Sequence, residues 1–155
     1  MVTGLASAAG SKVSTATGGT LVAGDLYALQ NALPPRFQPR AQWLASLATL
    51  NTARQFTTPN GSLSFPGLQG VPPLLLGRNV NEAPNMDTSV AAGKNLAIYG
   101  DFQNYVITQR VGAAVEFVPW ILGPNQRPTG KRGLWLWSRW GGGVVNPNGF
   151  RLLTA

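Results

Sequence analysis

Carboxylates are the side chains of this sequence that could carry out acid–base chemistry. The chain has neither cysteine nor histidine, which excludes disulfides, thiolate metal sites, cysteine nucleophiles and histidine-based triads. An enzyme would have to pair an acid and a base among five side chains. These are Asp25, Glu82, Asp87, Asp101 and Glu116.

Most of these carboxylates have a simpler structural explanation. Asp25 precedes a helical pattern and is a good helix N-cap. Asp101 lies in a turn between two predicted strands, and Glu116 alternates with apolar neighbours as the outward residue of a strand. We therefore expect no enzymatic activity, and no catalytic, cofactor-binding or metal-binding residues.

The composition is that of a folded subunit of an assembly. A chain of 155 residues with 44% apolar residues fits one domain with a sizeable core. Only 11% of the residues are charged, against about a quarter in an ordinary soluble domain. Nine arginines against three lysines, together with five tryptophans, match the bias of surfaces buried between subunits.

A net charge of +7 would attract polyanions or an acidic partner. The basic residues are scattered, however, and only Lys131 and Arg132 are adjacent. Trp135 and Trp137 could form stacking platforms for single-stranded nucleic acid beside these two cations. Because Trp135, Trp137 and Trp140 are surrounded by apolar residues, we favour core packing or subunit contact for them.

The first half of the chain predicts two short helices and a strand. Leu26, Leu29 and Leu33 recur at helical spacing, and the prolines at 34 and 35 end that helix. Residues 41–45 predict a buried strand, after which Ser46 caps a helix over residues 47–55 with Leu47, Leu50 and Ala53 on one face. Residues 57–93 are rich in Pro and Gly and predict loops with one or two strands.

The second half has a β pattern. Alternation from residue 95 to 110 predicts strands, and continues at Val115 and Phe117 after a turn at Gly112. Residues 121–132 predict a turn-rich connection. Residues 133–140 predict a strand with large apolar residues on both faces, and one of these faces should contact the core of the same chain. Gly141 to Gly143 predict a turn or bulge rather than a phosphate loop.

Several segments carry a family resemblance. Residues 95–110 read NLAIYGDFQNYVITQR, in which a short apolar strand leads into Gly-Asp-Phe and an aromatic-containing strand. Residues 133–140 and 144–153 read GLWLWSRW and VVNPNGFRLL. These segments resemble the C-terminal end of major capsid proteins of tailed bacteriophages, which share the HK97-like fold. The strand-to-helix step at residues 41–47 resembles the family too. Residues 75–80 resemble the family's step into a strand, except that Asn79 replaces the proline that usually precedes the valine.

The resemblance covers roughly residues 3–155 and implies the C-terminal part of such a protein. The family's N-terminal arm, extended two-stranded loop and long spine helix have no counterpart. The implied fold class is α+β, with a mixed or antiparallel sheet and a few short helices. Residues 1–24, which lack a secretory signal pattern, would be a flexible lead-in; residues 25–110 would form the axial region and residues 111–155 the peripheral strands.

The implied function is that of a structural subunit of a phage or prophage capsid. Its partners would be copies of itself in hexameric and pentameric capsomers, possible portal, scaffold or decoration proteins, and weakly bound packaged DNA, but no membrane. It would be made in the bacterial cytoplasm and end in the virion. The alternatives are a bacterial nanocompartment shell protein of the same fold and a basic nucleic-acid-binding module.

Overall fold

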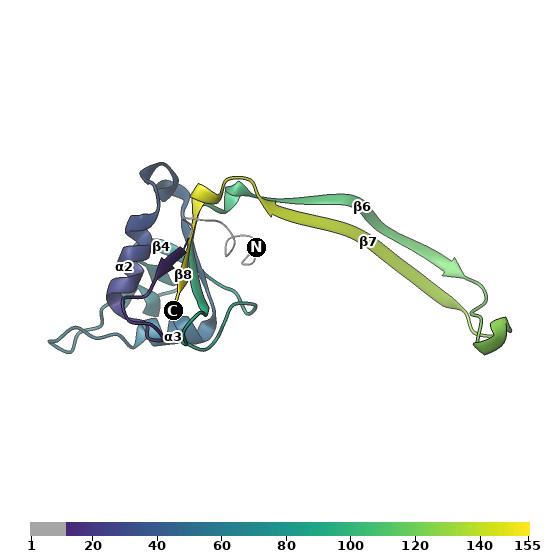
Figure 1. Cartoon of the computed structure of the whole chain (residues 1–155), viewed down its shortest axis with the longest axis horizontal. Helices are drawn as coiled ribbons and strands as arrows, with labels where there is room; N and C mark the ends of the chain where they lie inside the picture. Colours follow the sequence, from purple (N-terminus) through teal and green to yellow (C-terminus); the bar gives the residue numbers. More distant parts are fainter. Residues whose placement is uncertain (1–11) are drawn as a thin grey trace. The chain divides into compact units, whose positions relative to one another are not determined.

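The structure is a computed structural model that describes residues 12–155 (Figure 1). These residues form two compact units. The first unit contains the described residues up to Tyr105 together with Val144–Ala155, and the second is Val106–Gly143. We call the second unit the hairpin. The expectation for residues 1–11 as part of a flexible lead-in lies outside the described residues.

Helix α2 (Ala23–Ala32) has the apolar face that the leucine spacing predicts. Leu26, Leu29 and Leu33 are buried, and the helix ends at Leu33 before the two prolines. The expectation that Asp25 is the N-cap is wrong, because the helix begins two residues earlier with Val22 as its N-cap. Asp25 instead lies in the first turn, where its carboxylate accepts hydrogen bonds from the Val22 and Ala16 backbone N–H groups, both at 2.9 Å.

Helix α3 (Leu47–Arg54) follows strand β2 (Gln42–Ala45), as predicted. Ser46 is its N-cap and its hydroxyl accepts a hydrogen bond from the Thr49 backbone N–H at 3.4 Å. Leu50 and Ala53 are buried on the inner face of the helix. Leu47 is 47% exposed, because the first turn of the helix lies at the edge of the core.

The first unit is built on a mixed six-stranded sheet with the order β1-β8-β5-β2-β4-β3. Its remaining strands are β1 (Lys12–Ser14), β3 (Leu74–Leu75), β4 (Arg78–Glu82), β5 (Asn95–Gly100) and β8 (Phe150–Thr154). The β1–β8 and β2–β4 pairs are parallel, and the other three are antiparallel. Short 3₁₀ helices connect them: η1 (Pro35–Arg40), η2 (Pro66–Gln69), η3 (Phe102–Asn104) and η5 (Pro147–Gly149).

Strands that are neighbours in this sheet are often far apart in the sequence. Strand β1 lies within residues 12–24, which the sequence analysis placed in a flexible lead-in, yet Val13 pairs with Leu153. Strand β8, grouped by the sequence analysis with residues 111–155, pairs with both β1 and β5. Strands that pair across many residues of sequence leave no local signal, so neither the parallel β1–β8 pair nor the antiparallel β5–β8 pair is visible from alternation alone.

The core lies between α2 and the central strands (Figure 1). Leu96, Tyr99 and Leu153 are fully buried in it, and the rings of Trp43 and Tyr99 lie 4.4 Å apart between centroids. A second, smaller cluster on the sheet contains Ile98, Phe150 and Leu152. Each fully buried side chain of this size stabilises the fold by roughly 1.5–3 kcal/mol through loss of water-exposed apolar area.

The junction between β5 and η5 needs a residue without a side chain. A Cβ atom at Gly100 would lie 2.4 Å from the Gly149 carbonyl oxygen and 2.8 Å from the Phe150 Cα. The adjacent Asp101 backbone N–H donates to the same Gly149 oxygen at 2.9 Å. The Gly-Asp-Phe segment therefore forms a tight contact with the turn before β8, and Asp101 sits in a turn as predicted.

Candidate interaction surface of the hairpin

The hairpin is a two-stranded sheet of β6 (Tyr105–Val118) and β7 (Gly133–Val144) (Figure 1). The predicted turn at Gly112 is wrong, because β6 continues through this residue for 14 residues. Gly141 to Gly143 do not form a turn, since β7 includes all three; a bulge within the strand stays a prediction. Thr108 and Gly141 lie on neighbouring strands, where the Thr108 hydroxyl donates to the Gly141 carbonyl at 3.4 Å.

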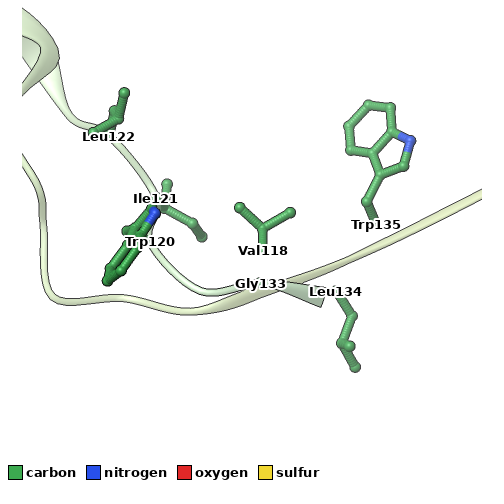
Figure 2. Close-up of a pocket in the computed structure, with 7 residues that line it drawn as sticks. All are labelled: Val118, Trp120, Ile121, Leu122, Gly133, Leu134 and Trp135. Atoms are coloured by element: carbon green, nitrogen blue, oxygen red, sulfur yellow. The ribbon is translucent and has the colours of Figure 1, made fainter. Parts of the chain in front are cut away.

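Both faces of the hairpin are open to solvent. Leu134 is 75% exposed and Trp135 is 62% exposed, although they point to opposite sides of β7 (Figure 2). The expectation that one face of this strand meets the core of its own chain is therefore wrong. Twelve of the nineteen large apolar side chains exposed in residues 12–155 lie in the hairpin.

The exposed apolar side chains of the hairpin make it a candidate interaction surface. Exposed apolar areas of this kind mark interaction sites, and an isolated two-stranded sheet is marginally stable in water. The strands contain no proline and no lysine, two residues that commonly protect exposed strand edges from pairing. The hairpin is thus able to bind another surface through its faces and its edges.

Residues 119–132 connect the two strands, and we call them the connector. They contain η4 (Pro124–Gln126) and form the turn-rich connection that the sequence predicts. The backbone N–H groups of Ile121 and Thr129 donate to the carbonyls of Lys131 and Ile121 respectively, both at 3.0 Å. The Gly123 N–H donates to the Arg127 carbonyl at 2.9 Å. The connector is therefore a hydrogen-bonded turn rather than an irregular loop.

An apolar pocket of about 450 Å³ lies where β6 and β7 meet the connector (Figure 2). We call it the connector pocket. Its lining consists of apolar side chains and one glycine: Val118, Trp120, Ile121, Leu122, Gly133, Leu134 and Trp135. Sequence reasoning gave no role to Trp120, Ile121 and Leu122, although an apolar run inside a turn-rich segment was a signal that could have identified them.

The hairpin is also strongly basic. It contains five basic residues and one carboxylate, so that a quarter of the chain carries more than half of the net charge. The basic residues are Arg110, Arg127, Lys131, Arg132 and Arg139. The two ion pairs among residues 12–155, Arg40–Asp101 at 4.0 Å and Lys94–Asp87 at 3.5 Å, both lie in the first unit.

The carboxylates of the chain are not gathered into a reaction centre. Asp101 accepts from the Gln103 backbone N–H at 3.1 Å, and Asp87 accepts from the Asn95 backbone N–H at 2.9 Å. The Asn95 hydrogen bond lowers the pKa of Asp87, as does, to a smaller extent, the Lys94 charge. Within residues 12–155, no three potential acidic metal ligands come together, and no helix is long and apolar enough to cross a membrane.

The structure brings together only some of the residues that were predicted to bind nucleic acid. Trp135 lines the connector pocket, and Lys131 and Arg132 directly precede its Gly133. Trp137 lies further along β7 and does not line the pocket. The hairpin therefore combines cations with an aliphatic and aromatic pocket at one end.

Comparisons with known proteins agree on one family. The family model described as the phage capsid family matches residues 1–155. No curated protein sequence matches the chain. The capsid of a native GTA particle, computed with C5 symmetry, is 25% identical with a TM-score of 0.73, over 92% of this chain and 48% of that chain. The capsid of the empty GTA particle has the same TM-score at 24% identity, over 92% and 47%.

The fold is also shared with more distant structures. The structure from Gordonia phage Cozz has a TM-score of 0.63 at 12% identity, over 94% of this chain and 50% of that chain. The chain thus spans about half the length of these solved chains. The mixed sheet with few helices confirms the expected α+β, HK97-like fold class. On the match over its whole length, this chain belongs to the phage capsid family.

Proposed function

We propose that this chain is a structural subunit of a phage or prophage capsid that self-associates into capsomers enclosing DNA. The observation that carries this proposal is the hairpin, which exposes apolar side chains on both faces in a chain of the phage capsid family. A monomer would leave these side chains in water, whereas a shell covers them with neighbouring subunits. Tryptophan and arginine, both present on the hairpin, are favoured in such contacts.

The two units suit different places in a shell. We assign the first unit, with its sheet and loops, to the region around the capsomer axis, and the hairpin to the peripheral region. Support comes from the separation of the units in the structure and from the order of segments in the family resemblance. Under this assignment β8 returns the chain from the peripheral region to the axial sheet.

Further partners and the location follow from the same proposal. Portal, scaffold and decoration proteins are candidate partners of the assembled shell, and packaged DNA is a candidate for weak contact with its basic residues. The protein would be made in the bacterial cytoplasm and would end in the virion. Because the chain belongs to a capsid family, we assign it a structural and not a catalytic role.

Assembly can be tested by changing the hairpin without changing the first unit. The double variant Leu134→Ser, Leu136→Ser makes β7 more polar, and Leu47→Ser changes an exposed leucine on α3 of the first unit. Light scattering and electron microscopy are carried out on the gene product that contains this chain. We expect rings or shells for the unmodified protein and for Leu47→Ser, and smaller species for the double variant.

Two results would contradict the proposal. One is an unmodified protein that stays monomeric at every concentration; the other is a double variant that assembles as the unmodified protein does. Tight, salt-sensitive binding of oligonucleotides by that monomer would favour the nucleic-acid-binding module instead.

A further inference from the structure

The connector end of the hairpin carries positive charge without compensation. Arg127, Lys131 and Arg132 are exposed, and the chain contains no Asp or Glu after residue 116. No ion pair of residues 12–155 involves any of the three cations. Three cations within six residues repel one another, so that a negatively charged partner is favoured at this end.

The same end of the hairpin has an apolar cavity. Arg132 is followed directly by Gly133, and Gly133, Leu134 and Trp135 line the connector pocket of about 450 Å³. A volume of this size accepts an aromatic or branched aliphatic side chain. Trp120, on the opposite side of the connector, is 68% exposed and also lines the pocket (Figure 2). A partner is therefore expected to supply an apolar anchor as well as negative charge.

Among residues 12–155 of a second copy, few carboxylates are free to supply the negative charge. Three of its five carboxylates, Asp25, Asp87 and Asp101, already accept hydrogen bonds within the first unit. Only Glu82 and Glu116 remain for a contact, and Glu116 lies on the hairpin itself. Contact between two connector ends would bring six cations together, which is unfavourable.

Nucleic acid would satisfy the charges but not the pocket. Phosphates pair with arginine and lysine, and bases stack on tryptophan, but Val118, Ile121, Leu122 and Leu134 would stay exposed to water. An apolar side chain from a protein would bury them, and acidic side chains beside it would reach the cations. Interfaces with a buried apolar centre and a charged rim have this composition.

We propose that the connector end of the hairpin binds an acidic segment of another protein. An apolar side chain of that segment fills the connector pocket, and its carboxylates pair with Arg127, Lys131 and Arg132.

The test uses a labelled peptide and the isolated chain. The probe is a fluorescein-labelled peptide with a phenylalanine–leucine pair between two runs of glutamates, and binding is followed by fluorescence anisotropy at low salt. Control peptides replace all glutamates by glutamine or the apolar pair by alanine. An oligothymidine strand of comparable length serves as the nucleic-acid probe.

Matched variants separate charge from pocket. We expect Lys131→Gln with Arg132→Gln to weaken binding about tenfold, whereas Lys12→Gln with Arg36→Gln, which removes the same charge from the first unit, changes it less than about twofold. We expect Trp120→Ala to weaken binding at least about fivefold. Trp140→Ala serves as its control, because Trp140 is 64% exposed but does not line the pocket.

The inference is overturned if the acidic peptide does not bind, or if the glutamine peptide binds equally well. It is also overturned if oligothymidine binds more tightly than the peptide and loses affinity in the same variants, which would identify a nucleic-acid surface. Circular dichroism of each variant shows that the fold is retained, and a variant that binds fully while lacking Lys131, Arg132 and Trp120 would exclude this site.

Discussion

The hydroxyl of Tyr99 donates a hydrogen bond of 2.7 Å to Oε1 of Gln38, 61 residues earlier in the chain. The Gln38 amide nitrogen in turn donates to the carbonyls of Gln30 and Leu33 at 2.7 and 3.2 Å. Strand β5 is thereby linked through η1 to the last turn of α2. The Leu33 carbonyl at the end of the helix thereby gains a donor, and the Gln30 carbonyl gains a second one beside the Leu33 backbone N–H at 3.3 Å.

Replacing Tyr99 with Phe is expected to destabilise the first unit by about 1–2 kcal/mol, because the partly buried Gln38 side-chain oxygen loses the donor of the buried Tyr99. Urea unfolding followed by circular dichroism gives the free energy of unfolding. The matched change Tyr27→Phe, on a residue that is 46% exposed, is expected to cost less than about 0.5 kcal/mol. Equal effects of the two changes would show that the hydrogen bond has no net stabilising effect.

The burial of Leu29 predicts a larger effect. Leu29 is 0% exposed, and Leu29→Ala should lower the free energy of unfolding by about 2–5 kcal/mol, through lost burial and a cavity under α2. Leu47→Ala on α3 should cost less, about 1 kcal/mol, because Leu47 is 47% exposed. A small loss for Leu29→Ala would mean that α2 is not packed on the sheet as described.

Asp87 predicts a dependence of stability on pH. The hydrogen bond from Asn95 lowers the pKa of Asp87 below its usual value of 3.8, so the charged form stabilises the fold. This stabilisation is fully present above pH 3.8 and is lost as the pH falls through the lowered pKa. Asp87→Asn should therefore lower the melting temperature at pH 7, and its difference from the unmodified protein should narrow in acid.

Glu82→Gln is the control for this measurement, because Glu82 has no hydrogen bond or ion pair through its side chain among residues 12–155. Its melting temperature should follow that of the unmodified protein from neutral pH to acid. A difference between Asp87→Asn and the unmodified protein that stays constant with pH would show that the Asp87 charge does not stabilise the fold.

The tryptophans predict a spectroscopic signature of assembly. Trp43 is buried, whereas Trp120, Trp135 and Trp140 are all more than 60% exposed. Acrylamide should therefore quench most of the fluorescence of the unassembled chain. If neighbouring subunits cover the hairpin, quenching should fall on assembly. Trp43→Phe should remove the protected fraction, and unchanged quenching in assembled particles would show that the hairpin remains uncovered.

The local parts of the fold could be predicted from the sequence because they depend on local patterns. Leucine spacing with a proline stop located α2, and Ser46 before an apolar run located α3. Asp25 was misplaced because a carboxylate is favoured both at the N-cap, where it accepts from N–H groups two or three residues later, and in the first turn, where it accepts here from the N–H of the N-cap residue Val22. Its identity alone does not distinguish the two positions.

The hairpin could be predicted less well, since its large apolar side chains are exposed to solvent instead of packing in the core of the chain. Large apolar residues such as Leu136 and Trp137 are typical of a core strand. Their residue types do not show whether they pack against the same chain or against another molecule. A glycine in a strand pattern often marks a turn or a bulge, but Gly112 lies within the continuous strand β6. The connector pocket depends on residues on both sides of a turn, so no single segment reveals it.

The place of β8 between β1 and β5 sets an order of events during synthesis. The ribosome completes residues 106–143 before it makes the strand that closes the sheet. Before β8 is made, the hairpin is exposed, and β1 and β5 lack the strand that pairs with both of them. A chain that stopped before residue 150 would expose the apolar side chains of the hairpin and would lack the strand that joins β1 to β5.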